Sequence, residues 1–191
     1  MHKVTYSMGV SLDGFIVGPD GQITGPGPDA ETWAYVKEEI RGVGVHLMGR
    51  RLYETMLYWE EPETHPEFDA DELEWTTLWN PLPKVVFSRT LTEVQGHARL
   101  ATGSVGEEIA RLKAEPGDGD IAIGGAELAA EVAALGLIDE YRIRVYPSLV
   151  GGGIPYFARD ERHVELELVE SRQFSSGMVL VRYRPTDRHP G

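Results

Sequence analysis

Apolar residues alternate with polar or small residues in several short stretches of the chain, and this period of two predicts β-strands. The first stretch carries Val4, Tyr6, Met8 and Val10, pauses at the turn signal Asp13-Gly14, and resumes at residues 15–17. Further stretches of strand length follow at 43–48, 85–87, 121–123, 141–146, 164–169 and 178–183. We therefore expect a sheet that uses most of the chain.

Helical patterns lie between the strands up to residue 141. We predict helices over residues 30–41, 52–57, 104–113 and 126–135, with another that ends at Trp79. Asp29 is the expected N-cap of the first helix, and Ser104 and Glu107 have the spacing of a capping box. Residues 60–74 contain eight acidic residues and two prolines, which predicts a solvated loop and the start of a helix.

This order of elements predicts a three-layer α/β/α fold. Strands that alternate with helices favour a mixed, mainly parallel sheet, and the strands after residue 146 favour an antiparallel edge at its C-terminal side. We expect one domain over residues 1–185 and a tail over 186–191. Sheets of this kind bind ligands beyond the carboxyl ends of their strands, so the candidate site lies in the loops that follow the strands.

Charge and cysteine content narrow the function classes. The chain has 18 basic and 31 acidic residues, a formal net charge of -13, which argues against nucleic acid and anionic membranes as partners. There is no cysteine, so disulfides, thiolate zinc sites and cysteine nucleophiles are excluded. We find no targeting segment or membrane span and expect a cytoplasmic protein that acts on a small molecule. None of the six histidines has metal-ligand spacing, so we predict no metal.

Three predicted strands end in sequences that suit phosphate or ribose. These are Met48-Gly49-Arg50-Arg51, Phe87-Ser88-Arg89 and Ile123-Gly124-Gly125-Ala126. Glycine lets the backbone approach a diphosphate, arginine grips phosphate in a bidentate fork, and the start of a helix offers free amides. Together they indicate a dinucleotide site, although the spacing matches neither the Rossmann fingerprint nor the P-loop.

The chain resembles the dihydrofolate reductase superfamily, and above all the branch that contains the C-terminal reductase domain of the bifunctional riboflavin-biosynthesis protein RibD. The resemblance covers nearly the whole chain and is carried by VSLDGFIV, LMGRRLYE, VVFSR, IAIGGAEL, IDEYRIRVYPSLVGGGIPYF and FSSGMVLVRYRP. Its most specific parts are MGRRLYE and the IGG that precedes a helix. A dihydrofolate reductase-like fold and an NADPH-dependent reductase are what this resemblance implies.

The resemblance also implies roles for individual residues in binding NADPH. Gly49, Arg50 and Arg51 would hold the diphosphate and the 2'-phosphate, and Ser88 and Arg89 the adenosine ribose phosphate. Gly124 and Gly125 would hold the diphosphate through a cis peptide bond, with Ala126 and Glu127 at the start of the following helix. Gly9 and Ile16 match positions that flank the nicotinamide.

The catalytic carboxylate is harder to place. Dihydrofolate reductases carry it on the first helix, where counting back from Gly49 reaches Trp33, a candidate substrate contact. Asp29 and Glu31 are nearby candidates, and so is Asp13 in the loop that borders the nicotinamide in the family. The alternative for each is structural: an N-cap for Asp29, a solvated first-turn acid for Glu31 and a turn residue for Asp13.

Arg144 is the other predicted substrate contact. It matches a position that borders the substrate in the family and shares a strand face with Arg142 and Tyr146. Two arginines facing a cleft would suit a phosphorylated or carboxylated substrate, and the alternative is that they face solvent or pair with acidic side chains.

The reaction that the resemblance implies is hydride transfer from NADPH to a small heterocyclic or ribosylamino-pyrimidine substrate, as in 5-amino-6-(5-phosphoribosylamino)uracil reductase. The alternatives are a non-catalytic nucleotide-binding module on the same fold and dihydrofolate reductase itself. Exposed sheet edges near the C-terminus, together with family habit, favour a homodimer.

Overall fold

One sheet of eight strands dominates the computed structural model, which describes residues 2–25, 27–160 and 162–186. In spatial order its strands are β5 (Ala98–Leu100), β4 (Lys84–Phe87), β3 (Val43–Gly49), β6 (Asp120–Gly124), β1 (Val4–Ser11), β7 (Glu140–Tyr146), β10 (Val179–Pro185) and β9 (Leu166–Gln173). Neighbours from β5 to β7 are parallel, whereas β10 and β9 each join antiparallel. The sheet is therefore mainly parallel with an antiparallel C-terminal edge, as the sequence predicts.

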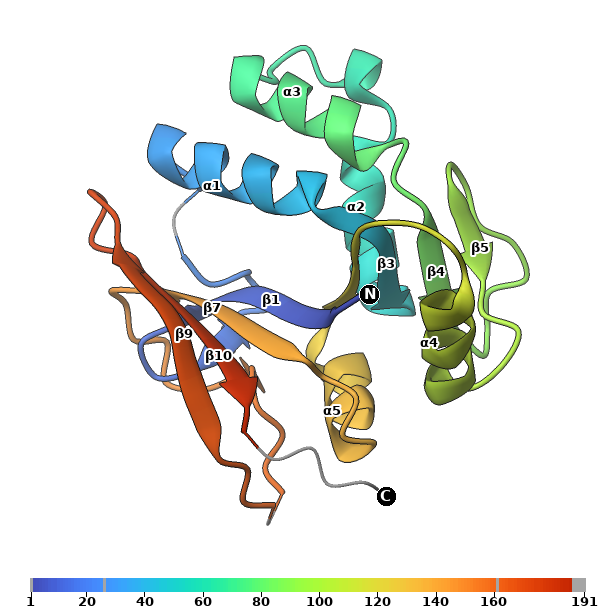
Figure 1. Ribbon diagram of the computed structural model, residues 1–191. Helices are drawn as coiled ribbons and strands as arrows, with labels where there is room; N and C mark the ends of the chain where they lie inside the picture. Colours follow the sequence, from blue (N-terminus) through green and yellow to red (C-terminus); the bar gives the residue numbers. More distant parts are fainter. Residues whose placement is uncertain (1, 26, 161, 187–191) are drawn as a thin grey trace.

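Helices cover both faces of this sheet (Figure 1). One layer contains α1 (Ala30–Arg41), α2 (Arg50–Met56) and α3 (Ala70–Trp79), and the other contains α4 (Val105–Ala114) and α5 (Ala126–Ala134). Two 3-10 turns, Leu57–Trp59 and Pro62–Thr64, connect α2 to α3. The strands β2 (Phe15–Val17) and β8 (Ile154–Pro155) form a separate antiparallel pair. This arrangement confirms the predicted three-layer α/β/α fold.

The alternation of side chains along each strand explains the two layers. In β3, Val45 and Leu47 belong to the core that also contains Ile109 of α4, whereas Met48 belongs to a second core with Trp79 of α3. Successive residues of a strand point to opposite faces, so one strand contributes to both cores. The central strands are buried on both faces for this reason.

Local signals placed most of the elements correctly. The first helix has the predicted bounds, with the Asp29 side chain accepting from the Thr32 amide, and the capping box of Ser104 and Glu107 is present. Two predictions were displaced, because α2 begins at Arg50 and β9 spans Leu166–Gln173. Sequence analysis missed β5 because Ala98-Arg99-Leu100 lacks the apolar run that marked the equally short strands at 85–87 and 121–123.

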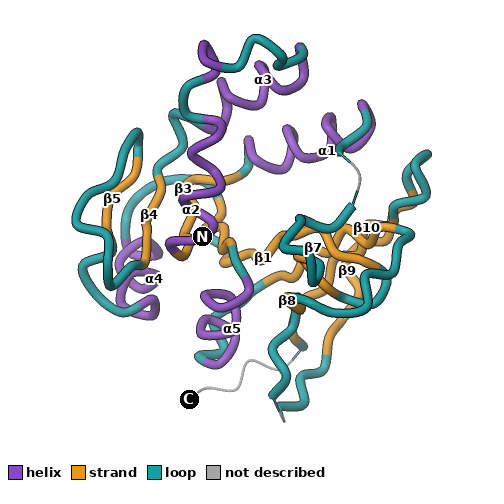
Figure 2. The backbone as a smooth tube through the Cα atoms, turned by 180° about the vertical axis from the view of Figure 1, so that it is seen from behind, coloured by secondary structure: helices purple, strands orange, loops and turns teal. Residues whose placement is uncertain are grey.

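The direction of the chain places the candidate site. Because β4, β3, β6 and β1 are parallel, the loops that follow them meet at one edge of the sheet, hereafter the carboxyl edge. Figure 2 shows β8 and its loops beside β7 and β10. Of the predicted tail, residues 187–191 lie outside the described residues. No helix within the described ranges has the length and apolar character needed to cross a membrane.

Candidate functional site at the carboxyl edge

The three predicted phosphate-binding sequences follow neighbouring strands. Gly49 at the end of β3 is level with Phe87 of β4, and Met48 is level with Gly124 of β6. Ser88, Arg50 and Gly125 directly follow these strand ends, so the fold brings together segments separated by up to 76 positions in the sequence (49 to 125). The prediction that they converge is therefore met by the geometry.

The glycines of this edge leave the backbone open. No atom lies within 4 Å of the position that a Cβ on Gly49 would occupy. Gly125 has φ 89° and ψ 137°, a conformation that favours glycine, and it turns the chain from β6 into α5. The peptide bond between Gly124 and Gly125 is trans, so the predicted cis bond is wrong: the positive φ of Gly125 makes the turn instead.

Gly124 has a different constraint. A Cβ on it would lie 2.5 Å from Cε1 of His46 and would also overlap Leu52. His46 is enclosed among Trp79, Lys84 and this turn, and burial, with a smaller contribution from the Lys84 charge, lowers its pKa to about 4. The imidazole is therefore neutral at pH 7 and serves as packing beneath the glycine turn.

The arginines of the carboxyl edge are loosely held. The Arg51 guanidinium lies 3.8 Å from Glu127 of α5, and Arg50 lies 3.6 Å from Glu54 of its own helix. Arg89 is exposed and makes no ion pair or hydrogen bond with the described residues. Weak exposed pairs of this kind exchange readily for a phosphate. The Ser88 hydroxyl is already engaged, since it accepts from the amides of Thr90 and Leu91.

Gly9, one of the two predicted nicotinamide positions, lies beside a tyrosine. A Cβ on Gly9 would lie 2.7 Å from Cε2 of Tyr146, and one on Gly25 would lie 2.7 Å from Cδ2 of the same ring. The Tyr146 ring thus fits between two glycines, one on β1 and one on the loop before α1. Ile16, the other predicted position, is buried in the main core.

All three candidate carboxylates already have hydrogen-bond partners. Asp29 caps α1, Glu31 accepts from the Ser175 amide at 2.8 Å and from Arg172 at 3.0 Å, and Asp13 accepts from the Gly151 amide at 2.7 Å. The pKa of each carboxyl is lowered, chiefly by the Thr32 amide for Asp29, by the Ser175 amide for Glu31, and by the Ser11 side chain for Asp13. Groups of this kind stay ionised at pH 7, which disfavours them as proton donors.

The two predicted substrate contacts have different surroundings. Trp33 of α1 is buried against Trp59 of the first 3-10 turn and Trp75 of α3. Arg144 donates from Nη1 to Ser7 at 2.9 Å and to Glu39 at 3.0 Å, while its Nε and Nη2 form no hydrogen bond within the described chain.

Arg142 is enclosed by carboxylates. Its Nε lies 2.6 Å from Glu140, and its terminal nitrogens lie 2.9 Å from Asp120 and 3.5 Å from Glu39. The alternative to substrate binding, that these arginines pair with acidic side chains, therefore applies to Arg142. Sequence reasoning missed Glu39, which both arginines share; only its spacing of four residues from Tyr35, which places both on one helix face, could have indicated it.

This strand order, with a helical layer on each face and an antiparallel C-terminal pair, defines a dihydrofolate reductase-like fold. The chain belongs to the RibD C-terminal domain family, which matches residues 2–180. The uncharacterized protein YyaP of Bacillus subtilis (strain 168) is 31% identical over 187 residues, which cover 95% of this chain and 94% of YyaP.

Solved structures agree with this membership. A structure from Shewanella sp. PV-4, assigned by name to riboflavin biosynthesis, has a TM-score of 0.75 and 25% identity, covering 98% of this chain and 100% of its own. The diaminohydroxyphosphoribosylaminopyrimidine deaminase/5-amino-6-(5-phosphoribosylamino)uracil reductase of Thermotoga maritima has a TM-score of 0.68 and 16% identity. The match covers 96% of this chain and 56% of the Thermotoga protein. At this level of identity the similarity concerns the fold alone.

Proposed function

We propose that this protein is an NADPH-dependent reductase that transfers a hydride to a small heterocyclic or ribosylamino-pyrimidine substrate. One observation carries the proposal: Gly49, Gly124 and Gly125 end neighbouring strands, beside arginines that the described chain neutralises weakly or not at all. Membership of a reductase family supports the same reaction class.

The residues at the carboxyl edge fit the cofactor. The space beside Gly49 and the turn at Gly125 allow a diphosphate to approach the backbone, and α5 offers the free amides of its first turn. Arg50, Arg51 and Arg89 supply positive charge for the phosphates. When bound, NADPH supplies the hydride, and the chain orients the donor against the acceptor.

On the acceptor side, we propose that Tyr146 and Arg144 border the substrate. Gly9 leaves room for the Tyr146 ring, and the unused Nε and Nη2 of Arg144 are donors for an oxygen of the acceptor. Trp33 supports this region through the aromatic packing of α1 and does not itself need to contact the substrate.

Cofactor titration tests the proposal. Binding of NADPH and NADH is followed by quenching of the four tryptophans and by energy transfer to the nicotinamide. We expect NADPH to bind at least about tenfold more tightly, a difference of about 1.4 kcal/mol. Arg51→Gln and Arg89→Gln should reduce that preference, whereas Arg184→Gln on the distant β10 should not. The proposal would be refuted if neither NADPH nor NADH bound at millimolar concentrations.

A non-catalytic nucleotide-binding module is the second candidate, because Asp13, Asp29 and Glu31 all have structural partners. An acceptor screen with phosphorylated pyrimidines, pterins and dihydrofolate separates the two. A reductase turns over at least one acceptor, and Asp13→Asn, Asp29→Asn or Glu31→Gln then identifies a catalytic carboxylate by loss of turnover with unchanged NADPH affinity. NADPH binding without any turnover would favour the module, and turnover of dihydrofolate alone would identify a dihydrofolate reductase.

A further inference from the structure

Arg144 of β7 is held at one end of its guanidinium only. Its Nη1 donates to Ser7 at 2.9 Å and to Glu39 at 3.0 Å, whereas Nε and Nη2 form no hydrogen bond with the described residues. The Arg144 side chain is 15% exposed, and neither of these two nitrogens is buried. Two adjacent N–H donors in one plane, the free edge of Arg144, are therefore available to an oxygen atom of a ligand.

The counter-charge of Arg144 is the carboxylate of Glu39. This carboxylate accepts from Ser7 at 3.0 Å and from Tyr35 at 3.3 Å as well as from Arg144. Hydrogen bonds from donors favour the ionised form of a carboxyl group. Burial, with a smaller contribution from Glu39, raises the pKa of Tyr35, so its hydroxyl keeps the proton that it donates. Glu39 therefore brings a full negative charge to Arg144.

The neighbouring bases supply no spare positive charge among the described residues. Three basic side chains beside this pair face three acidic ones: the bases are Lys3, Arg142 and Arg182, and the acids are Asp120, Glu140 and Glu170. Arg142 also lies 3.5 Å from Glu39, and at the start of α1 Glu31 pairs with Arg172 at 3.0 Å. Each base of this region is thus matched by a carboxylate.

On the sheet, Arg144 lies between uncharged residues. It is level with Gly9 of β1 and Leu180 of β10, and Tyr146 follows two positions later on the same strand face. Leu180 is buried, and the Tyr146 ring packs against Gly9. An anion at the free edge of Arg144 would therefore lose water without gaining a second cation.

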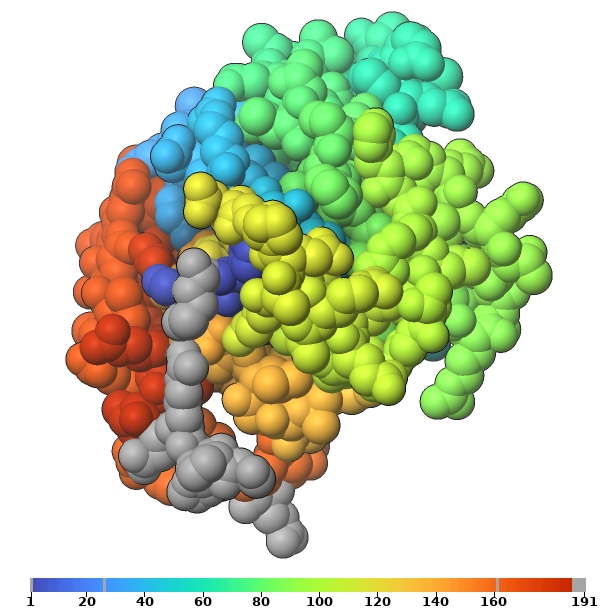
Figure 3. Space-filling model, turned by 45° about the vertical axis from the view of Figure 1, so that its right-hand side comes forward, coloured from blue at the N-terminus to red at the C-terminus, as the bar shows by residue number. Residues whose placement is uncertain are grey.

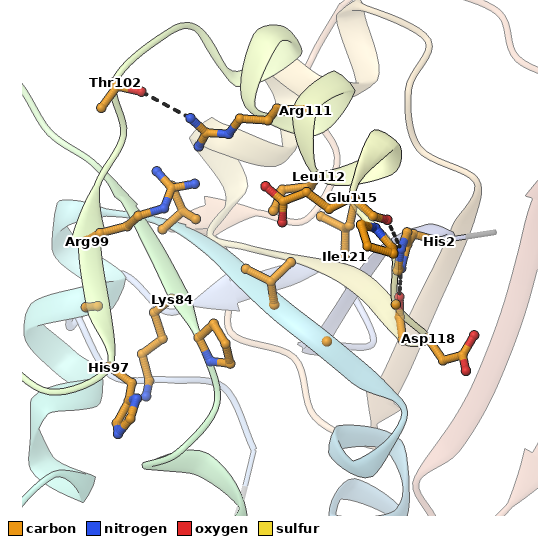
Figure 4. Close-up of a pocket in the computed structure, with 18 residues that line it drawn as sticks. His2, Lys84, His97, Arg99, Thr102, Arg111, Leu112, Glu115, Asp118 and Ile121 are labelled. Atoms are coloured by element: carbon orange, nitrogen blue, oxygen red, sulfur yellow. Dashed lines mark hydrogen bonds between the residues drawn. The ribbon is translucent and has the colours of Figure 1, made fainter.

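The same matching of charges applies to a cavity of about 690 Å³ at the amino-terminal ends of β3, β4, β5 and β6 (Figure 4). The segment that follows α4, yellow in Figure 3, closes one side of this cavity where it lies against the N-terminal end of the chain. Arg99 and Arg111 both bond to the buried Glu108, and Glu115 follows Arg111 by four residues. Carboxylates balance these arginines too, so this cavity is not a second site for an anion.

We propose that the acceptor presents an uncharged carbonyl oxygen, as in a lactam ring, to the free edge of Arg144, and that no phosphate or carboxylate of the substrate is held there. A guanidinium donates strongly to a neutral carbonyl, and that contact avoids the cost of burying a second ion. An anion must lose water beside an arginine whose charge Glu39 already balances. The sequence-based expectation that Arg142 and Arg144 together suit an anion is replaced. This assignment of the acceptor rests on the proposed reductase function.

Two pyrimidines that differ in one substituent test the proposal. 6-Methyluracil has only lactam carbonyls, and orotate carries a carboxylate in place of the methyl group. Binding of each to the cofactor-free protein is followed through the Arg144 Nε resonance in ¹H–¹⁵N NMR spectra, which is assigned by its loss in Arg144→Lys. We expect 6-methyluracil to shift this resonance saturably with a Kd on the order of 1 mM, and orotate to bind at least about tenfold more weakly.

Removal of the counter-charge tests the cause of this preference. Glu39→Gln should bind orotate at least about fivefold more tightly than the wild type does, while its affinity for 6-methyluracil changes by less than about twofold. Glu38→Gln, which removes an exposed carboxylate from the same helix, should leave both affinities unchanged. Urea unfolding shows whether Glu39→Gln is folded under the binding conditions, and the wild-type comparison decides by itself if it is not.

Three results overturn the proposal: orotate binds the wild type as tightly as 6-methyluracil does, neither pyrimidine shifts the Arg144 resonance, or folded Glu39→Gln binds orotate as weakly as the wild type does. The reductase function fails on a different result, because it requires NADPH binding and these titrations contain no cofactor. A wild type that binds NADPH and prefers orotate would remain a candidate reductase and would rule out the uncharged acceptor group alone.

Discussion

Replacement of Glu108 by glutamine should remove a pH-dependent part of the stability of the fold. The carboxylate accepts from Arg99, from Arg111 and from the Thr102 amide, and its side chain is 1% exposed. Burial alone would raise its pKa, but the bonds from Arg99 and Thr102 and the charges of both arginines outweigh it and lower the pKa from 4.5 to about 2. The ionised form is therefore favoured in the folded state.

The magnitude follows from this pKa. Each tenfold change in proton affinity is worth about 1.4 kcal/mol, so a pKa near 2 in the folded chain and 4.5 in the unfolded chain limits the contribution to about 3 kcal/mol. Both arginines are nearly half exposed and partly screened by solvent, so we expect about 2 kcal/mol. Because the folded pKa is depressed, this stabilisation is complete above pH 4.5 and is lost as the pH falls toward 2.

Urea unfolding monitored by tryptophan fluorescence measures this difference at a series of pH values. Glu108→Gln should be less stable than the wild type by about 2 kcal/mol at pH 7, and the two curves should converge at about pH 2. Glu131→Gln, which removes an exposed carboxylate without an ion pair in the described chain, is the matched control and should follow the wild type throughout. A difference between wild type and Glu108→Gln that stays constant with pH would refute the electrostatic reasoning, because a packing defect does not titrate.

Three further predictions concern the glycine turn, α1 and the edge of the sheet. Gly124→Ala should lower the free energy of unfolding by about 1–3 kcal/mol, because the added methyl group overlaps His46 and Leu52. Gly49→Ala, where the added methyl group meets no atom, should lower it by less than about 1 kcal/mol. Equal losses for the two variants in urea unfolding would contradict the packing argument. Glu39→Gln should cost about 3 kcal/mol in the same assay because two arginines lose a shared counter-charge, and Glu38→Gln, 80% exposed, should change little. We also propose a homodimer through the exposed edge strand β9, so Leu168→Glu should convert dimer to monomer in sedimentation, and a monomeric wild type would exclude it.

The local pattern of apolar residues and capping residues is sufficient to predict most of this fold. The first helix could be predicted because its cap, Asp29, and its end lie within the helical segment itself. The sheet could be predicted because successive strands alternate with helices, which restricts the connections to parallel crossovers. The strand β5 was missed because Arg99 interrupts its short sequence, so that it shows no apolar run.

The candidate site is predictable only where it is built from strand ends. Glycine and arginine that follow parallel strands must meet at one edge, so Gly49, Arg89 and Gly125 could be grouped from the sequence. The contacts of Asp13 and Glu31 could not be predicted, because their partners are distant in the chain. Glu31 bonds to Ser175, 144 positions away, and no local pattern records that contact.

The carboxylates around each arginine decide whether it can bind a ligand. Arg142 lies among Glu39, Asp120 and Glu140 and is committed to the fold. Arg144 shares only Glu39 and keeps donors free, and Arg89 has no ion pair among the described residues. An acidic chain neutralises an arginine wherever the fold brings a carboxylate within reach, so an arginine left without one marks a place that an anion can occupy. By this criterion Arg89 is open to an anion, and Arg50 and Arg51 are less so because they pair with Glu54 and Glu127, although the net charge of -13 taken alone suggests that the whole surface repels anions.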